Sequence, residues 1–207
     1  MDANSFAASG AWIAQALYTV GLVPQVITNF RLQQGSGLSE LWLFGYLNMY
    51  IAMLFYVGLI GLPPAYMILV PMQTALVLIL IAQRLWYDRS DRGRQMGVFY
   101  LLNIALAIVL IPYAQQHSYL VGMYAGWFNA GLGTISQGAQ VVKVFFAKSV
   151  IGFDAVFVTL IGIAGGIECV SAIVGGFPMQ TVVGSGRVFF MTLIYCYQFW
   201  IYQPHHA

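Results

Sequence analysis

The sequence predicts an all-α integral membrane protein with seven transmembrane helices, and two observations carry this prediction. Hydrophobic residues make up 60% of the 207 residues and charged residues only 7%, whereas a soluble domain needs about a quarter of its residues charged to cover its surface. The apolar residues also fall into blocks of about 20, the length that a helix needs to cross a bilayer. Connections between the blocks are short, so the chain leaves no room for a separate soluble domain.

Seven apolar blocks follow one another, separated by runs of glycine, proline and polar residues that end helices. They cover residues 9–30, 39–60, 64–86, 96–114, 119–146, 152–175 and 180–203. Five of the six breaks are Gln33 to Gly37, Gly61 to Pro64, Asp88 to Gln95, Gln115 to His117 and Gly175 to Pro178. We expect one membrane-spanning helix from each block.

The basic residues predict how these helices are oriented. With the N-terminus outside or lumenal, seven basic residues lie on the cytoplasmic side and one lies toward the other face: Arg31, Arg84, Arg89, Arg92, Arg94, Lys143 and Lys148 against Arg187. Cytoplasmic loops carry an excess of Lys and Arg. The C-terminal tail, Tyr202 to Ala207, is therefore expected in the cytosol. A bacterial plasma membrane and an organelle membrane both fit, and we favour the former.

An internal repeat subdivides the chain, because one offset of 115 residues recurs in three separate segments. It pairs Gln25 with Gln140, Gly37-Leu38 with Gly152-Phe153, and Gln83 and Tyr87 with Gln198 and Tyr202. A single span separates the copies, so both enter the membrane in the same direction. The sequence thus predicts two parallel three-helix bundles: a first repeat at 1–87, a loop and linker helix at 88–117, and a second repeat at 118–207. Transporters with parallel repeats hold their substrate near the membrane midplane.

A motif at the end of the first block resembles that of a known family. It reads Pro24-Gln25-Val26-Ile27-Thr28-Asn29-Phe30-Arg31, followed by Gly37-Leu38-Ser39. This resembles the PQ-loop signature. The second copy is degraded, with Ala139-Gln140 in place of Pro-Gln, Val144 in place of Asn, and the ending Lys148-Ser149-Val150-Ile151-Gly152-Phe153. The family includes lysosomal cystine and cationic amino-acid exporters and shares its fold with SWEET sugar transporters, so the resemblance implies a membrane transporter.

The same motif predicts a hinge formed by Pro24, Gln25 and Gln140. A proline inside a helix removes one backbone hydrogen bond and kinks or swivels the helix. We expect the Gln25 side chain to bond the backbone groups that Pro24 frees, since such a break is tolerated in a membrane only where polar groups or water satisfy it. A static kink is the alternative. Because the second copy lacks the proline, the first helix is expected to move more than the fifth.

Two charged residues inside the apolar blocks are the leading candidates for solute binding. Glu168 lies in a stretch without any other ionisable group, about two turns from the outer end of its helix. A carboxylate at that depth costs several kcal/mol unless it is protonated or paired, so it is a functional candidate. Arg187 lies at a comparable depth in the last helix. An ion pair that joins the two helices, or an Arg187 that snorkels to the interface, is the structural alternative.

The offset places Met53 and Met72 where the second repeat has Glu168 and Arg187, so the charges belong to the second half only. In SWEET-type relatives the position that matches Met53 carries a substrate-stacking Trp, which implies that Glu168 lies at or beside the pocket. The resemblance likewise puts Gln73 near a pocket Asn of the sugar transporters.

Further amides inside the spans are Asn48 and Asn129, for which ligand binding and helix packing remain open, and Asn103, for which packing is preferred. Tyr18, Tyr46, Tyr50, Tyr56 and Trp127 are aromatic residues that a pocket can use.

These residues favour a transporter of a small polar solute. The leading hypothesis is an amino acid, moved with protons by alternating access, with Arg187 for the carboxylate and Glu168 for the ammonium group or the proton. A SWEET-like sugar uniporter is the first alternative, and a seven-helix receptor that binds a peptide terminus without flux is the second. No nucleophile with a base, metal-ligand cluster or phosphate loop points to an enzyme, a cofactor or a metal. The expected partners are the solute, protons and lipid, not nucleic acid.

Overall fold

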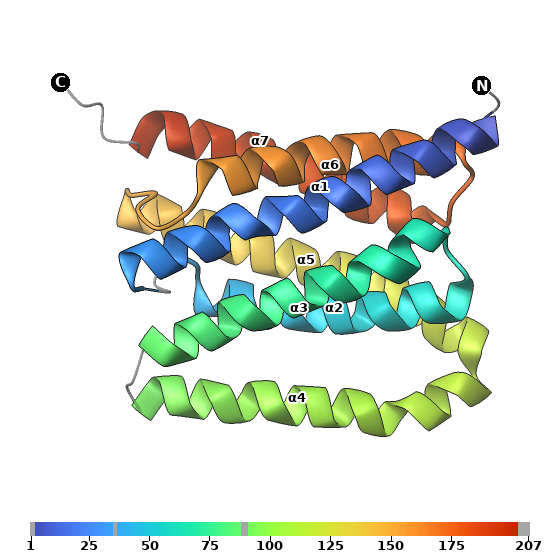
Figure 1. Cartoon of the computed structure of the whole chain (residues 1–207), viewed down its shortest axis with the longest axis horizontal. Helices are drawn as coiled ribbons and strands as arrows, with labels where there is room; N and C mark the ends of the chain where they lie inside the picture. The colour runs from blue at the N-terminus through green and yellow to red at the C-terminus, as the bar shows by residue number, and fades with distance from the viewer. Residues whose placement is uncertain (1–2, 35–36, 88–90, 203–207) are drawn as a thin grey trace.

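The computed structural model describes residues 3–34, 37–87 and 91–202. These residues form seven α-helices and no strands: α1 (Ala3–Leu32), α2 (Glu40–Ile60), α3 (Pro64–Tyr87), α4 (Asp91–Gln116), α5 (Ser118–Ala147), α6 (Ala155–Val174) and α7 (Met179–Tyr202). The helices lie side by side along the long axis of the molecule (Figure 1). Helix α1 begins at one end of this bundle and α7 finishes at the other. The predicted all-α fold is confirmed.

The observed helices coincide with the predicted blocks to within a few residues. The largest differences are at α1, which begins at Ala3 instead of residue 9, and at α4, which begins at Asp91 instead of residue 96. Apart from Phe6, both extensions add polar or small residues to an apolar stretch. Backbone hydrogen bonding continues past the apolar stretch there, so hydropathy alone underestimates helix length.

Five of the seven described helices are long and apolar enough to cross a membrane: α1, α2, α3, α6 and the Gln95–Gln116 part of α4. Helices α5 and α7 have sufficient length, but each buries a row of polar side chains: Ser136, Gln137 and Gln140 on α5, and Gln180, Thr181, Ser185, Thr192 and Gln198 on α7. Their exposed faces carry large apolar residues such as Phe128, Phe146, Phe190 and Trp200. The buried polar faces lower the mean hydropathy of α5 and α7, although the exposed face of each helix is apolar. The chain is a multi-pass membrane protein.

The offset of 115 residues recurs in the helix boundaries themselves. It relates both ends of α1 to those of α5 and both ends of α3 to those of α7, while α2 and α6 start in register and end one residue apart. The helix N-caps, Ser39 and Asp154, are related in the same way. So are residues with positive φ at helix ends, Gln33 with Lys148 and Gly61 with Gly176. The two halves therefore share one backbone plan.

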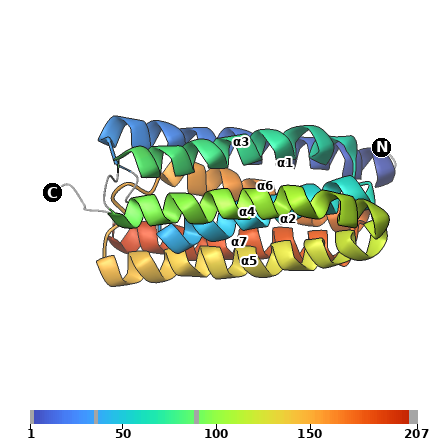
Figure 2. The same ribbon diagram turned by 90° about the horizontal axis from the view of Figure 1, so that it is seen from below.

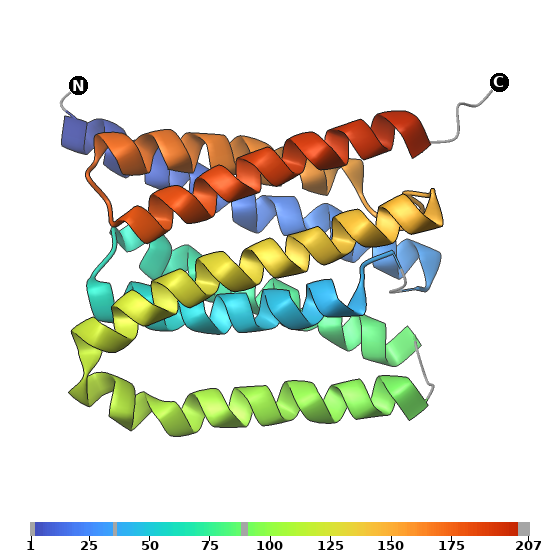
Figure 3. The same cartoon turned by 180° about the vertical axis from the view of Figure 1, so that it is seen from behind.

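Packing follows the same plan. Helix α3 contacts both α1 and α2, and its counterpart α7 contacts both α5 and α6. The halves meet through two equivalent pairs, α1 with α6 and α2 with α5. Helix α4 lies along one edge, in contact with α2, α3 and α5 (Figures 1 and 2), and Figure 3 shows α5 and α7 on the face behind. We propose from this arrangement the division into 1–87, 88–117 and 118–207; residues 88–90 and 203–207 lie outside the described part.

Candidate functional site

A polar cavity of about 70 Å³ lies in the middle of the bundle. Every helix except α4 contributes to its lining, which includes Gln15, Tyr18, Met49, Met53, Tyr56, Gln73, Asn129, Glu168, Thr181 and Arg187. Three of the six lining helices come from each repeat. The cavity thus lies between the halves, where parallel-repeat transporters hold their substrate.

Glu168 reaches this cavity from α6 and is held by two donors on α1. The side chain is only 6% exposed. Gln15 Nε2 donates to Glu168 Oε1 at 2.8 Å, and Tyr18 Oη donates to Glu168 Oε2 at 2.9 Å. Gln73 Nε2 in turn donates to Gln15 Oε1 at 2.9 Å. These bonds offset the cost of burying the carboxyl group and fix its orientation.

Arg187 lies in the same cavity but is held separately. Its Nη1 donates to Gln137 Oε1 at 3.2 Å, and its Nη2 lies 3.9 Å from Met49 Sδ. The Nε atom is buried and has no hydrogen-bond partner within the described residues. A guanidinium has five N–H donors, and both partners here are uncharged. Among the described residues no ion pair within 4.0 Å joins Arg187 to Glu168, so neither the ion pair nor the snorkelling alternative describes this arginine.

An aromatic layer separates the cavity from one end of the bundle. Trp42 stacks on Tyr46 with ring centroids 4.0 Å apart and meets the edge of Phe157 at 6.0 Å. The Tyr195 hydroxyl donates to the backbone oxygen of Gln137 at 2.8 Å. The side chain of the same glutamine accepts from Arg187. The aromatic layer therefore packs directly against the residues that hold the guanidinium.

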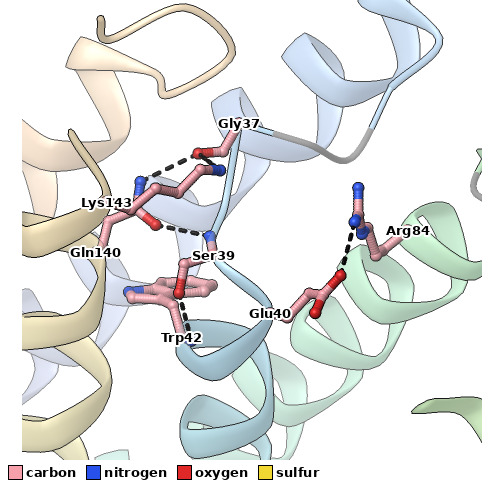
Figure 4. A network of polar contacts seen from close by, with 7 residues as sticks. All are labelled: Gly37, Ser39, Glu40, Trp42, Arg84, Gln140 and Lys143. Atoms are coloured by element: carbon pink, nitrogen blue, oxygen red, sulfur yellow. Dashed lines mark hydrogen bonds and ion pairs between the residues drawn. The ribbon is translucent and has the colours of Figure 1, made fainter. Parts of the chain in front are cut away.

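Beyond this layer, two glutamines join the repeats at what we call the glutamine end, defined by Gln25 and Gln140. Gln25 Nε2 donates to Gly152 O at 2.9 Å, and its Oε1 accepts from Asp154 N at 3.0 Å. In the other half, Gln140 Nε2 donates to the Gly37 oxygen at 3.1 Å, and its Oε1 accepts from the Ser39 backbone at 2.7 Å (Figure 4). Each glutamine thus clamps the loop of the opposite repeat. The two clamps use the same atoms of residues that are 115 positions apart: the glutamine Nε2 and Oε1, one backbone oxygen and one backbone N–H.

Further side chains support each clamp. Lys143 Nζ donates to the Gly37 oxygen at 2.9 Å (Figure 4), and at the equivalent position Thr28 Oγ1 donates to Asp154 Oδ2 at 2.8 Å. Glycines are required where the two loops meet, because a Cβ on Gly37 would overlap the backbone of Gly152. The glutamine end is therefore closed by hydrogen bonds and by backbone contact.

Comparison with known families gives a match over a segment that includes Gln25. Residues 11–66 match the family described as PQ loop repeat. This segment is a PQ-loop repeat. It contains the motif at Pro24-Gln25, all of α2 and the loop at Gly37, and the family suggests a membrane protein of the transporter type. No curated protein matches the chain.

The PQ-loop glutamine has a different role from the one expected from the sequence. The prediction that Gln25 bonds the backbone freed by Pro24 is wrong, because its amide bonds the opposite repeat and Asn29 Oδ1 at 2.9 Å. Helix α1 runs through Pro24 without interruption. Pro24 and Gln25 are adjacent and so face different directions on the helix. Gln25 is fully buried between the repeats, while Val20, whose carbonyl Pro24 leaves free, is exposed.

The other candidate residues divide into two groups. Gln73 and Asn129 line the cavity with Glu168 and Arg187, and Asn129 Nδ2 donates to the Met49 oxygen at 3.0 Å. Asn48 does not line it. It bonds the Phe44 oxygen of its own helix at 2.9 Å and borders an apolar groove between α2, α4 and α5, together with Asn103 and Trp127.

Sequence reasoning missed Gln15 and Gln137, which hold the two charged groups. Both are buried, at 2% and 3% exposure. A signal was available, since each is an amide inside an apolar span and Gln137 lies one turn before the clamp residue Gln140. Their partners on other helices could not be read from the sequence.

Proposed function

We propose that this protein transports an amino acid across the membrane by alternating access, with a proton carried through Glu168. The observation that supports the proposal is that Glu168 and Arg187 line one cavity without pairing to each other. A neutral solute has no need of two separate buried charges, which are costly in a membrane. A zwitterion offers a group of opposite sign to each.

Arg187 and Glu168 bind opposite ends of the solute. Arg187 receives the solute carboxylate, because its fork of N–H donors matches the two carboxylate oxygens and its Nε has no described partner. Glu168 receives the ammonium group or, when the solute has left, a proton. Gln15 and Tyr18 hold the carboxyl group in both states, since an amide and a hydroxyl can donate to an ionised carboxylate or accept from a protonated one.

The transport cycle requires the glutamine end to open. In the structure this end is closed by the two clamps and the aromatic layer. Because Gln25 and Gln140 each bond across the repeat interface, moving one repeat against the other must break both clamps. We propose that this end faces the cytosol, with the N-terminus outside, and that Pro24 allows α1 to bend as the clamps open.

Counterflow in proteoliposomes tests the proposal. Purified protein is reconstituted, loaded with unlabelled solute, and assayed for uptake of labelled amino acids and labelled sugars at pH 5.5 and pH 7.5. We expect uptake of at least one amino acid, faster at the lower external pH, and its loss in Arg187→Met. Liposomes that contain the Leu106→Ala variant serve as the control for reconstitution. Leu106 is an exposed residue of α4 that does not line the cavity.

Two results would replace the proposal. Uptake of a sugar with none of any amino acid would favour a sugar uniporter. Saturable binding of a peptide terminus to the purified protein, without uptake of any solute, would favour a receptor.

A further inference from the structure

Arg187 owes its position to a glycine on the neighbouring helix. The side chain extends from α7 to α5, where its Nη1 bonds Gln137 at 3.2 Å. Gly133 lies one turn before Gln137 on the same buried face of α5. A Cβ built on Gly133 would overlap Nη1, Cζ and Nη2 of Arg187. The guanidinium therefore lies directly against the α5 backbone, in space that any other residue at position 133 would occupy.

The equivalent position in the first repeat has the opposite character. Gly133 corresponds through the offset of 115 to Tyr18, whose hydroxyl donates to Glu168 at 2.9 Å. At this shared position the first repeat has Tyr18, whose large side chain bonds Glu168. The second repeat has Gly133, whose lack of a side chain leaves room for Arg187.

We propose that Gly133 is the positioning residue that makes the cavity selective for a carboxylate. It acts through Arg187: only with glycine at 133 does the guanidinium stay back against α5, bonded to Gln137, with its remaining N–H groups directed at a solute. A methyl group at 133 forces the guanidinium away from α5 and into the volume that the solute carboxylate needs. This inference rests on the proposed function, in which Arg187 binds that carboxylate.

Helix α5 supplies matched controls. Gly131 and Gly138 lie within five residues of Gly133, and a Cβ on either would meet nothing within 4 Å. Alanine favours the helix over glycine at all three positions. A loss confined to Gly133→Ala therefore reports the overlap with Arg187 and not the change in backbone freedom.

The first measurement compares transport of an amino acid with that of its amide, which keeps the ammonium group but lacks the carboxylate. For the amino acid, Gly133→Ala is expected to raise KM between about tenfold and a hundredfold, the loss of one charge-assisted interaction, with a smaller change in kcat. Gly131→Ala and Gly138→Ala should match the wild type. For the amide, Gly133→Ala should change KM less than threefold. An equal rise for acid and amide, or equal behaviour of all three variants, would overturn the role of Gly133 while leaving amino-acid transport in place.

The second measurement is binding without flux, read as the rise in melting temperature of the detergent-solubilised protein with increasing amino acid. The wild type and Gly138→Ala should be stabilised, and Gly133→Ala should not. In an Arg187→Met background, Gly133→Ala should have no further effect. Stabilisation that depends on Gly133 but without flux would support the carboxylate site and count against transport. Neither flux nor stabilisation in the wild type would overturn both proposals.

Discussion

The two repeats share the glutamines that join them and differ in the residues that line the cavity. Gln25 and Gln140 make the same two cross-repeat bonds from equivalent positions. At the cavity the correspondence ends. Through the offset of 115, Glu168 corresponds to Met53, and Gly133, which lies against the Arg187 guanidinium, corresponds to Tyr18. In the proposed transport cycle, the equivalent residues are those that must separate together, and the unequal residues are those that bind the solute.

This difference has a physical basis. A gate between two halves opens only when both of its seams open, so an equal clamp on each seam keeps the halves in step. Solute recognition has no such requirement, since a zwitterion is itself asymmetric and needs one acid and one base. Equivalent clamps and unequal cavity residues are therefore both expected of a transporter of such a solute, and each can be tested separately.

Removing both clamps should have the largest effect. Each glutamine satisfies one backbone N–H and one backbone oxygen, and leaving such groups unpaired costs about 1–3 kcal/mol each. Gln25→Ala and Gln140→Ala together should lower the melting temperature and open the glutamine end. The opening is measured by maleimide labelling of Val150→Cys, which is only 7% exposed, with Cys169 and Cys196 replaced by serine.

The single variants sharpen the comparison. If the clamps are equivalent, Gln25→Ala and Gln140→Ala should each raise the labelling rate to a similar extent, and the pair should exceed their sum because either clamp alone still holds the halves. A single variant that reproduced the full effect of the pair would show that one seam closes the gate alone.

Glu168→Gln should have the next largest effect, on the pH dependence of uptake. Proton-coupled uptake by the wild type should fall about tenfold for each unit rise in external pH once the carrier is mostly deprotonated. The side-chain amide of glutamine cannot bind and release a proton in this pH range. Uptake by Glu168→Gln should therefore be nearly independent of pH. The control is Glu40→Gln, an acid outside the cavity that pairs with Arg84 at 3.0 Å. A pH profile unchanged in Glu168→Gln would remove the proton role.

The sequence predicted the framework better than the contacts across it. The number and order of the helices and the offset of 115 could be predicted because apolar blocks and repeated segments are visible in the sequence itself. Glu168 and Arg187 were available because charges in apolar blocks are rare. The sequence did not predict the partners Gln15 and Gln137, the role of Gly133 or the direction in which Gln25 bonds. Each of these depends on which faces of separate helices meet. Asn48 illustrates the same limit: it was as plausible as Asn129 in sequence, but it lies on the other face of α2, toward α4.

The residues beside the clamps should have smaller effects. Lys143→Met removes one donor to the Gly37 oxygen, but Gln140 still bonds that oxygen at 3.1 Å. Thr28→Val removes one donor to Asp154, whose other carboxylate oxygen still caps α6 through Phe157 N at 2.9 Å. Each variant should raise Val150→Cys labelling about fivefold, equivalent to about 1 kcal/mol. A large effect of Lys143→Met alone would show that the second seam depends on its lysine more than on its glutamine.

Pro24→Ala should have the smallest effect, and it tests a feature of the glutamine end that the second repeat lacks. Alanine at 24 restores an N–H that can bond the Val20 carbonyl, which stiffens α1 without touching either clamp. The transport rate should fall about two- to threefold, the kinetic equivalent of less than 1 kcal/mol, while KM stays constant because no cavity residue moves. Pro112→Ala, which changes the proline inside α4 in the same way, should leave the rate unaltered. Equal rates for wild type and Pro24→Ala would mean that Pro24 is a static kink. The repeats would then open as equals, as Ala139 at the corresponding position of α5 already allows without a proline.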